Sequence, residues 1–251
     1  MPRRTSLACG LLATLTLPPA LADNHIEAPT FFPVEMHTCN YVGNADRADL
    51  DRVIAKYNKW ADKHDQTYSA WTLTPNFVNP KVTMDIGWLG AWSSGMNMGK
   101  SLDTWREKGN QADFDKVLSC DSHNGAAAVN VKPLPEGDAP EGSLVTFSSC
   151  TLAEGITPDK AYESHLKMSA WWKSQESTAG TWLFYPGYGS GSTDMDYYVV
   201  AAYANYTELG KDFERFTNGG GWMKAAEFFD GVADCDGARV YEAKLVRSGT
   251  E

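Results

Sequence analysis

The feature that most constrains this chain is an internal duplication. A shift of 111 residues aligns the chain with itself without a gap, so that Cys39 matches Cys150 and Trp60 matches Trp171. Matched cysteines, tryptophans and prolines in one register indicate two copies of one structural unit. Further pairs in this register are Lys56 with Lys167, Trp71 with Trp182, Pro75 with Pro186, and Met84 and Asp85 with Met195 and Asp196; near the end the shift grows to 115, and Cys120 matches Cys235.

Each copy is predicted to fold in the order strand, helix, strand, strand, helix, strand. β-branched and aromatic residues mark the strands, and Asp46 and Thr157 stand where an N-cap residue would begin the first helix of each copy. This order is that of the split βαβ, or ferredoxin-like, unit. The strands are expected at 34–41, 68–73, 84–92 and 126–132, then at 144–152, 181–185, 195–204 and 238–246, and the helical regions at about 46–63, 98–118, 157–175 and 206–233.

Residues 1–22 have the pattern of a secretory signal peptide. Arg3 and Arg4 precede a short apolar run at 7–17, and Ala20 and Ala22 supply small residues at alternate positions before the expected cleavage. The apolar run is too short to span a bilayer, and no other segment is long enough, so we expect no membrane insertion. The sequence therefore predicts a periplasmic or secreted protein.

The charge of the chain excludes two classes of partner. The formal net charge is −10, with 22 Lys and Arg against 32 Asp and Glu. The basic residues form no cluster, whereas nucleic acids and anionic membranes require one. We therefore expect no nucleic-acid partner.

The cysteines beyond the signal peptide are predicted to form one disulfide in each copy. In a ferredoxin-like unit the last strand lies antiparallel beside the first, which brings Cys39 near Cys120 and Cys150 near Cys235. An even number of cysteines in an oxidising compartment favours disulfides over metal sites. We therefore predict a structural role for all four.

The chain resembles the dimeric α+β barrel superfamily of ferredoxin-like domains, in the form where two copies are fused. The resemblance covers about 31–247 and rests on the element order, the duplication and the nearly continuous apolar strand at 197–203. It implies an α+β fold in which two tandem βαββαβ ferredoxin-like repeats pack sheet to sheet as a fused barrel, with helices outside. The predicted organisation is a signal peptide at 1–22, a first repeat at 23–132, a linker at 133–142 and a second repeat at 143–247.

The two copies differ most informatively on their first helix. Where the first copy has Val53 and Ile54, the second has Ser164 and His165. One interpretation is a pocket between this helix and the second sheet, with His165 as acid, base or ligand; the other is a rotated helix with His165 half solvated at its edge. The residues predicted to line the pocket are Ser164, His165, Met168, Trp172 and Trp182.

Other titratable residues give weaker signals. His37 lies on the first strand, whereas His64 and His123 lie in segments that look exposed. No histidines or cysteines have the spacing of a metal site, so neither a metal nor a cofactor is predicted. Asp85 and Asp196 are expected to hold turns.

Three functions remain open, because members of the superfamily include cofactor-free monooxygenases, haem-binding enzymes, isomerases and plain binding proteins. The first is binding of a small apolar or aromatic molecule. The second is a cofactor-independent oxygenase or isomerase with a histidine base in the second repeat. The third is an envelope or interaction protein with a filled interior. No nucleophile elbow or nucleotide fingerprint is present, and a barrel complete in one chain predicts a monomer or weak homo-oligomer.

Overall fold

The computed structural model describes residues 29–137 and 142–249. The predicted signal peptide and residues 138–141 of the predicted linker lie outside the described residues. No helix within the described ranges has the length and apolar character that crossing a membrane requires.

The first half of the chain follows the predicted order. Its elements are β1 (Phe31–Tyr41), α1 (Arg47–Lys63), β2 (Ser69–Phe77), β3 (Ile86–Ala91), α2 (Gly95–Lys108), α3 (Gln111–Phe114) and β4 (Leu118–Lys132). Helix α1 begins at a capping box, in which Asp46 accepts from the backbone N–H of Asp49 and Asp49 accepts in return. Strand β4 begins eight residues before the predicted start, because Cys120 belongs to the strand and does not precede it.

The second half repeats this order with one extra short strand. Its elements are β5 (Gly142–Leu152), α4 (Pro158–Ser174), β6 (Gly180–Pro186), β7 (Tyr197–Tyr203), α5 (Tyr206–Thr217), α6 (Gly221–Phe229), β8 (Ala233–Cys235) and β9 (Arg239–Arg247). The expected single helical region is divided into α5 and α6, and Gly220 between them has φ of 84°, which favours glycine.

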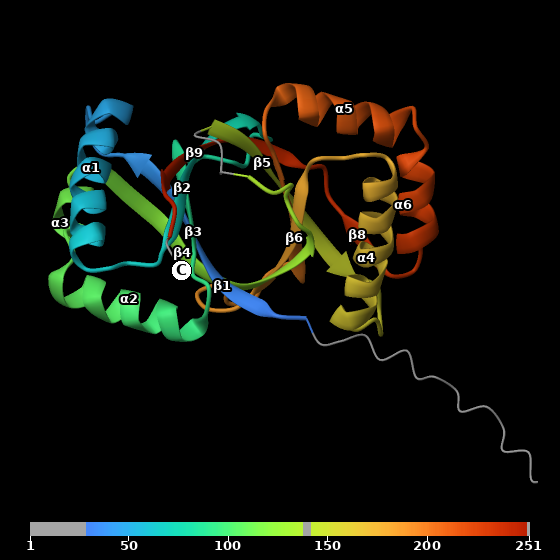
Figure 1. The fold of residues 1–251 in the computed structure, drawn as a ribbon, viewed down its shortest axis with the longest axis horizontal. Helices are drawn as coiled ribbons and strands as arrows, with labels where there is room; N and C mark the ends of the chain where they lie inside the picture. Colours follow the sequence, from blue (N-terminus) through green and yellow to red (C-terminus); the bar gives the residue numbers. More distant parts are fainter. Residues whose placement is uncertain (1–28, 138–141, 250–251) are drawn as a thin grey trace, which may run out of the picture.

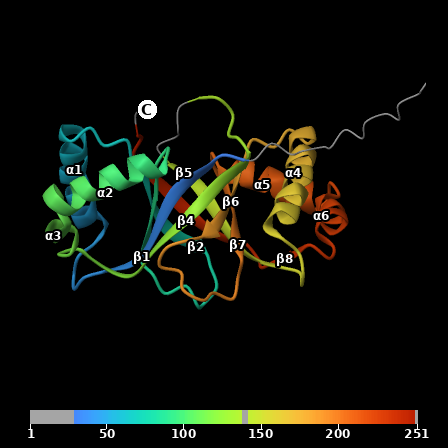
Figure 2. The same cartoon turned by 90° about the horizontal axis from the view of Figure 1, so that it is seen from below.

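The strands form one closed antiparallel barrel. The order is β4-β1-β3-β2 in the first half and β9-β5-β7-β6 in the second, and β8 adds beside β5. Two seams join the halves, because β4 pairs with β6 and β2 pairs with β9. Figure 1 looks along the barrel, with α1, α2 and α3 outside one wall and α4, α5 and α6 outside the opposite wall, and Figure 2 shows the same two groups from below. The predicted α+β barrel with external helices is confirmed.

The halves therefore meet edge to edge through hydrogen bonds, and not only through facing sheet surfaces. Strand β2 pairs with β9 from Ala70 onward, and it lengthens this seam by continuing through Pro75, where the sequence suggested an end, as far as Phe77. The pairing of β2 with β9 shifts register between Pro75 and Phe77. A bulge is where a sheet tolerates a proline, which has no N–H to donate.

Alternation along the strands separates three apolar cores. On β1, Val34 and Met36 point into the barrel, whereas Glu35 and His37 point outward to the helices. The interior is filled from both halves, with Val34 and Leu73 packing in one cluster with Phe147 and Phe184. A second core lies beneath α1 and a third beneath α4.

Both predicted disulfides are confirmed. Cys39 on β1 is bonded to Cys120 on β4, with an S–S distance of 2.02 Å. Cys150 on β5 is bonded to Cys235 on β8, with an S–S distance of 1.98 Å. Each bond ties together residues that are also directly paired between strands.

The matched acids also have equivalent structural roles. The Asp85 carboxylate accepts from the backbone N–H of Tyr41, and the Asp196 carboxylate accepts from that of Leu152. Both acids hold the segment before the third strand of their half against the end of its first strand, so neither belongs to a shared acid–base pair.

We predict that the two disulfides contribute similarly to stability. Their sequence separations are 81 and 85 residues, and loops of this length correspond to about 4 kcal/mol on the chain-entropy model. Replacing Cys39 and Cys120 by alanine, or Cys150 and Cys235 by alanine, should lower the unfolding free energy by up to that amount in urea denaturation. A loss confined to one pair would contradict the equivalence.

Candidate functional site

A cavity lies between the outer face of the first-half sheet and the helices α1, α2 and α3. Its volume is about 520 Å³, which is within the range of small-molecule sites. Its polar wall includes Glu35, His37 and His123. We call this space the first cavity. Its aromatic lining is Tyr57, Trp60, Tyr68, Trp88, Trp92, Trp105 and Phe114.

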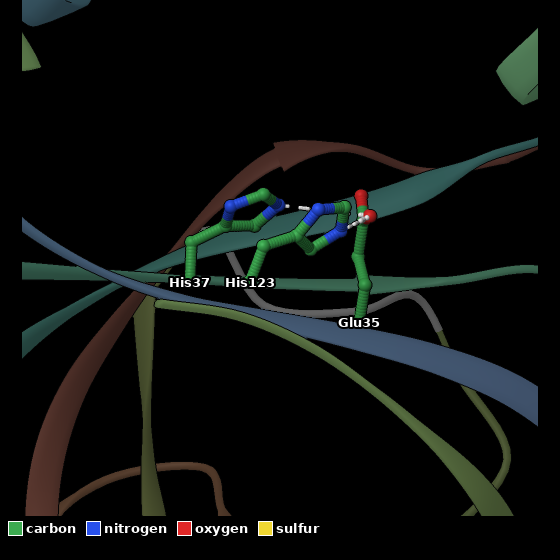
Figure 3. A group of neighbouring side chains, drawn as sticks. All are labelled: Glu35, His37 and His123. Atoms are coloured by element: carbon green, nitrogen blue, oxygen red, sulfur yellow. Dashed lines mark hydrogen bonds and ion pairs between the residues drawn. The ribbon is translucent and has the colours of Figure 1, made fainter. Parts of the chain in front are cut away.

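The polar residues are brought together by strand pairing. Glu35 and His37 are two apart on β1 and so share its outer face, and His37 lies directly opposite His123 on β4. The two imidazole rings stack with centroids 3.9 Å apart and planes at 15°. The Glu35 carboxylate lies 2.7 Å from Nε2 of His123 and 3.6 Å from Nε2 of His37 (Figure 3).

A chain of hydrogen bonds orients the Glu35 carboxylate from the other side. The indole N–H of Trp88 donates to the Tyr68 hydroxyl at 2.6 Å, and that hydroxyl donates to Glu35 Oε1 at 2.5 Å. Tyr68 can reach this position only because residue 90 is glycine. A Cβ added to Gly90 would lie 1.8 Å from the tyrosine oxygen.

These contacts keep Glu35 ionised despite its burial. The carboxylate side chain is 12% exposed, and burial alone would raise its pKa. The hydrogen bonds with His123 and His37 outweigh burial and lower the pKa of Glu35 to about 2. The same bond with Glu35 raises the pKa of His123 above its ordinary value, against partial desolvation.

The second half has no counterpart of this cluster. The shifts that align the copies place Thr146 at the position of Glu35, Ser148 at that of His37 and Ala238 at that of His123. Ala179 and Ala201 likewise stand where the first half has Tyr68 and Gly90. These second-half residues line a broader space of about 1270 Å³ under α4 and α6, which we call the second cavity.

His165 is buried, so the interpretation that leaves it half solvated at a helix edge is wrong. The residue is 7% exposed, its Nε2 lies 3.0 Å from the Tyr197 hydroxyl, and its ring packs on Phe229 with centroids 4.6 Å apart. Tyr197 stands where the first half has Ile86, so a hydrogen-bonded pair replaces two isoleucines. Burial lowers the pKa of His165 to about 3.

The predicted pocket residues are only partly brought together. His165, Met168 and Trp172 line the second cavity. Ser164 is buried on α4 but does not line that cavity. Trp182 packs with the barrel interior, because it alternates on β6 with Leu183, which faces α4.

Sequence reasoning missed the cluster of Glu35, His37 and His123. It treated the histidines as isolated, because they are 86 positions apart. The predicted disulfide carried the missing signal, since pairing Cys39 with Cys120 fixes the register of two antiparallel strands. In a regular antiparallel pair that places Cys39 opposite Cys120, His37 would lie opposite Ser122. One bulge between Thr38 and Cys39 shifts the register by one residue, so that His37 pairs with His123.

Comparison with known proteins gives a fold but no sequence family. No protein-family profile matches the chain, and no curated protein matches it in sequence. Among solved structures, a putative chlorite dismutase has a TM-score of 0.54 at 10% identity, covering 88% of this chain and 97% of that one. An anthrone oxidase-like protein has a TM-score of 0.51 at 10% identity, covering 88% and 94%.

The chain has the dimeric α+β barrel fold. A chlorite dismutase from Candidatus Nitrospira defluvii, in complex with imidazole, is also similar, with a TM-score of 0.50 at 9% identity and coverage of 86% and 92%. Likeness at this identity establishes the architecture and not the reaction.

Some dimeric α+β barrel proteins bind haem, and His165 is the buried histidine beside the second cavity that could ligate its iron. His165 Nε2 is already bonded to the Tyr197 hydroxyl. A metal-binding histidine is usually oriented by a carboxylate or carbonyl at its other nitrogen, and none of the hydrogen bonds found in the described residues does this for His165. With Nε2 held by Tyr197 and no such partner at the other ring nitrogen, the His165 imidazole is not oriented as a ligand for haem iron.

We predict that Gly90→Ala is destabilising because of Tyr68. The added methyl group should lower the unfolding free energy by about 1–3 kcal/mol, as overpacking does. In a Tyr68→Ala background the same change should cost almost nothing, because the tyrosine ring that the methyl group would strike is gone. The double variant then has alanine at both positions, as the second half has at Ala179 and Ala201. Equal costs in both backgrounds, measured by urea denaturation, would contradict the assigned contact.

We predict that His165 makes the fold less stable as pH falls from about 6.5 to about 3. Its pKa is 6.5 when unfolded and about 3 when folded, so the unfolded chain binds the proton first. His165→Gln keeps a polar partner for Tyr197 and cannot titrate. Over this interval the variant should lose about 1.4 kcal/mol less per pH unit than the parent, measured by urea denaturation at several pH values. Identical pH profiles would show that His165 is not buried as neutral imidazole.

Proposed function

We propose that this protein binds a small, flat aromatic molecule in the first cavity. The observation that carries the proposal is a space of about 520 Å³ walled by aromatic rings and holding one polar cluster. Ligand sites typically combine an apolar lining with a few fixed polar groups.

The walls favour a planar ligand. Trp105 stands edge-on to Trp60 with ring centroids 4.9 Å apart, and Trp88 stands edge-on to Phe114 at 5.7 Å. Rings in such arrangements offer faces and edges on which another aromatic ring packs well. Leu102 on α2 adds an aliphatic contact to the lining.

The polar groups favour a ligand that carries a hydrogen-bond acceptor. The indole N–H groups of Trp60 and Trp92 are buried without a partner among the described residues, and both residues line the first cavity. Unpaired buried donors are costly. Because both indole nitrogens are themselves buried, a carbonyl oxygen in the cavity could accept from one of them after its ring turns toward the cavity. An aromatic ketone therefore suits the site better than a hydrocarbon.

The alternative of an enzyme with His165 as base has weaker support. A general base works best with a pKa near the operating pH, whereas that of His165 is about 3. The similar solved structures include proteins named for enzymes, but likeness in fold does not carry a reaction to this chain.

We also infer that the two halves are tandem ferredoxin-like repeats, at 23–132 and 143–247, joined by the linker at 133–142 and preceded by a signal peptide at 1–22. The shared register and the matching strand orders support the duplication. The two disulfides support a periplasmic or secreted location. A barrel closed within one chain supports a monomer or weak homo-oligomer.

Binding can be tested with 9-fluorenone, a rigid aromatic ketone, and with fluorene, which has the same rings without the oxygen. Fluorenone should quench tryptophan fluorescence saturably and bind about tenfold more tightly than fluorene, as one added hydrogen bond would give. Metal-free buffer with a chelator keeps the measurement independent of any bound ion.

A matched pair of variants locates the binding. Leu102→Trp should fill the first cavity and weaken fluorenone binding at least tenfold. Phe213→Trp, at the equivalent position on α5, should leave binding unchanged, because Phe213 is 64% exposed and lines neither cavity. Equal effects of the two variants, or no saturable binding by the parent protein, would refute the proposal.

A further inference from the structure

We propose that Glu35, His37 and His123 bind one divalent transition-metal ion whose remaining coordination positions face the first cavity. This inference does not rest on the proposed aromatic ligand, since it concerns the polar wall alone.

The three side chains are already within reach of one ion. One ligand atom from each lies within 4.8 Å of the others. An ion bonded at about 2.0–2.2 Å holds neighbouring ligand atoms roughly 3–3.5 Å apart. The distances from Glu35 Oε2 to Nε2 of His123 and His37, 2.7 and 3.6 Å, lie on either side of that range.

Only side-chain rotation is needed to complete the site. The stacked imidazole rings extend side by side from paired positions on β1 and β4, with the carboxylate near both Nε2 atoms (Figure 3). Splaying the rings about their side-chain bonds would direct both nitrogen lone pairs at one point beside Glu35. The paired strands, tied by the Cys39–Cys120 bond two residues from His37, need not move.

The ligand types select the class of ion. Two imidazoles and one carboxylate suit zinc, ferrous iron, cobalt and related ions. Calcium and magnesium prefer sites made entirely of oxygen. Three protein ligands leave positions open for water or another small ligand.

The surroundings supply the orientation and the access that metal sites require. The Tyr68 hydroxyl donates to Glu35 Oε1 and leaves Oε2 beside the histidines. Trp88 fixes that hydroxyl in turn, so both residues hold the carboxylate in place. The His123 side chain is 56% exposed, which gives an ion a path from solvent.

The second half provides an internal contrast. Thr146, Ser148 and Ala238 stand at the positions of Glu35, His37 and His123. The first half thus has three possible metal ligands, whereas none of the three equivalent residues in the second half has an imidazole or a carboxylate. A structural need shared by both copies does not account for the cluster.

Cobalt(II) offers a direct test, because its visible absorption reports protein coordination. The full chain with both disulfides intact, stripped with a chelator, should bind one Co²⁺ with new visible bands, and Zn²⁺ should displace it. His37→Ala and His123→Ala should each weaken binding about 100-fold or more. Tyr68→Phe, which alters only a positioning residue, should weaken it about tenfold and shift the bands.

Controls separate this site from adventitious binding. His64→Ala removes a histidine outside the cluster and should leave the affinity and spectrum unchanged. If an alanine variant loses its near-ultraviolet circular dichroism, His37→Gln and His123→Gln test the same two ligands with smaller changes in volume. Failure to bind one Co²⁺, binding that survives loss of either histidine, or binding that His64→Ala abolishes would overturn the proposal.

Discussion

The architecture depends on the hydrogen-bonded closure of one barrel from two half-sheets. Each half alone would expose the backbone of two edge strands, which invites pairing with other chains. The seams of β4 with β6 and β2 with β9 remove those edges. They also enclose an interior filled by side chains from both halves. The outer faces of the barrel therefore remain for the helices, and both cavities lie between helices and sheet.

Much of this fold could be predicted from sequence, because the register in which the sequence matches itself and the positions of the cysteines are long-range constraints. The register between the copies gave the order of elements, and the antiparallel neighbourhood of the first and last strands paired the cysteines correctly. Local propensity could not locate the start of β4 at Leu118 or the passage of β2 through Pro75. Pairing with a neighbouring strand decided both, and single-segment patterns do not contain that information.

The candidate site was less predictable, because the sequence comparison of the two halves used differences on the first helix and did not use differences between paired strands. His165 in place of Ile54 drew attention correctly to a buried imidazole, but Tyr197 at the position of Ile86 satisfies it. A second difference places the titratable side chains in the first half. The first half has Glu35 and His37 where the second half has Thr146 and Ser148, and only the register of β1 with β4 brings His123 to the first pair.

The position of β9 in the barrel has a consequence for biosynthesis. β9, the last strand in chain order, pairs with β2, one of the earliest, and also lies beside β5. While the chain is being made, the first half emerges with the edge of β2 uncovered, and that edge stays open until residues 239–247 have followed. A growing chain would need chaperones to protect that strand until β9 arrives, and clipping of β9 would reopen the seam in the finished protein.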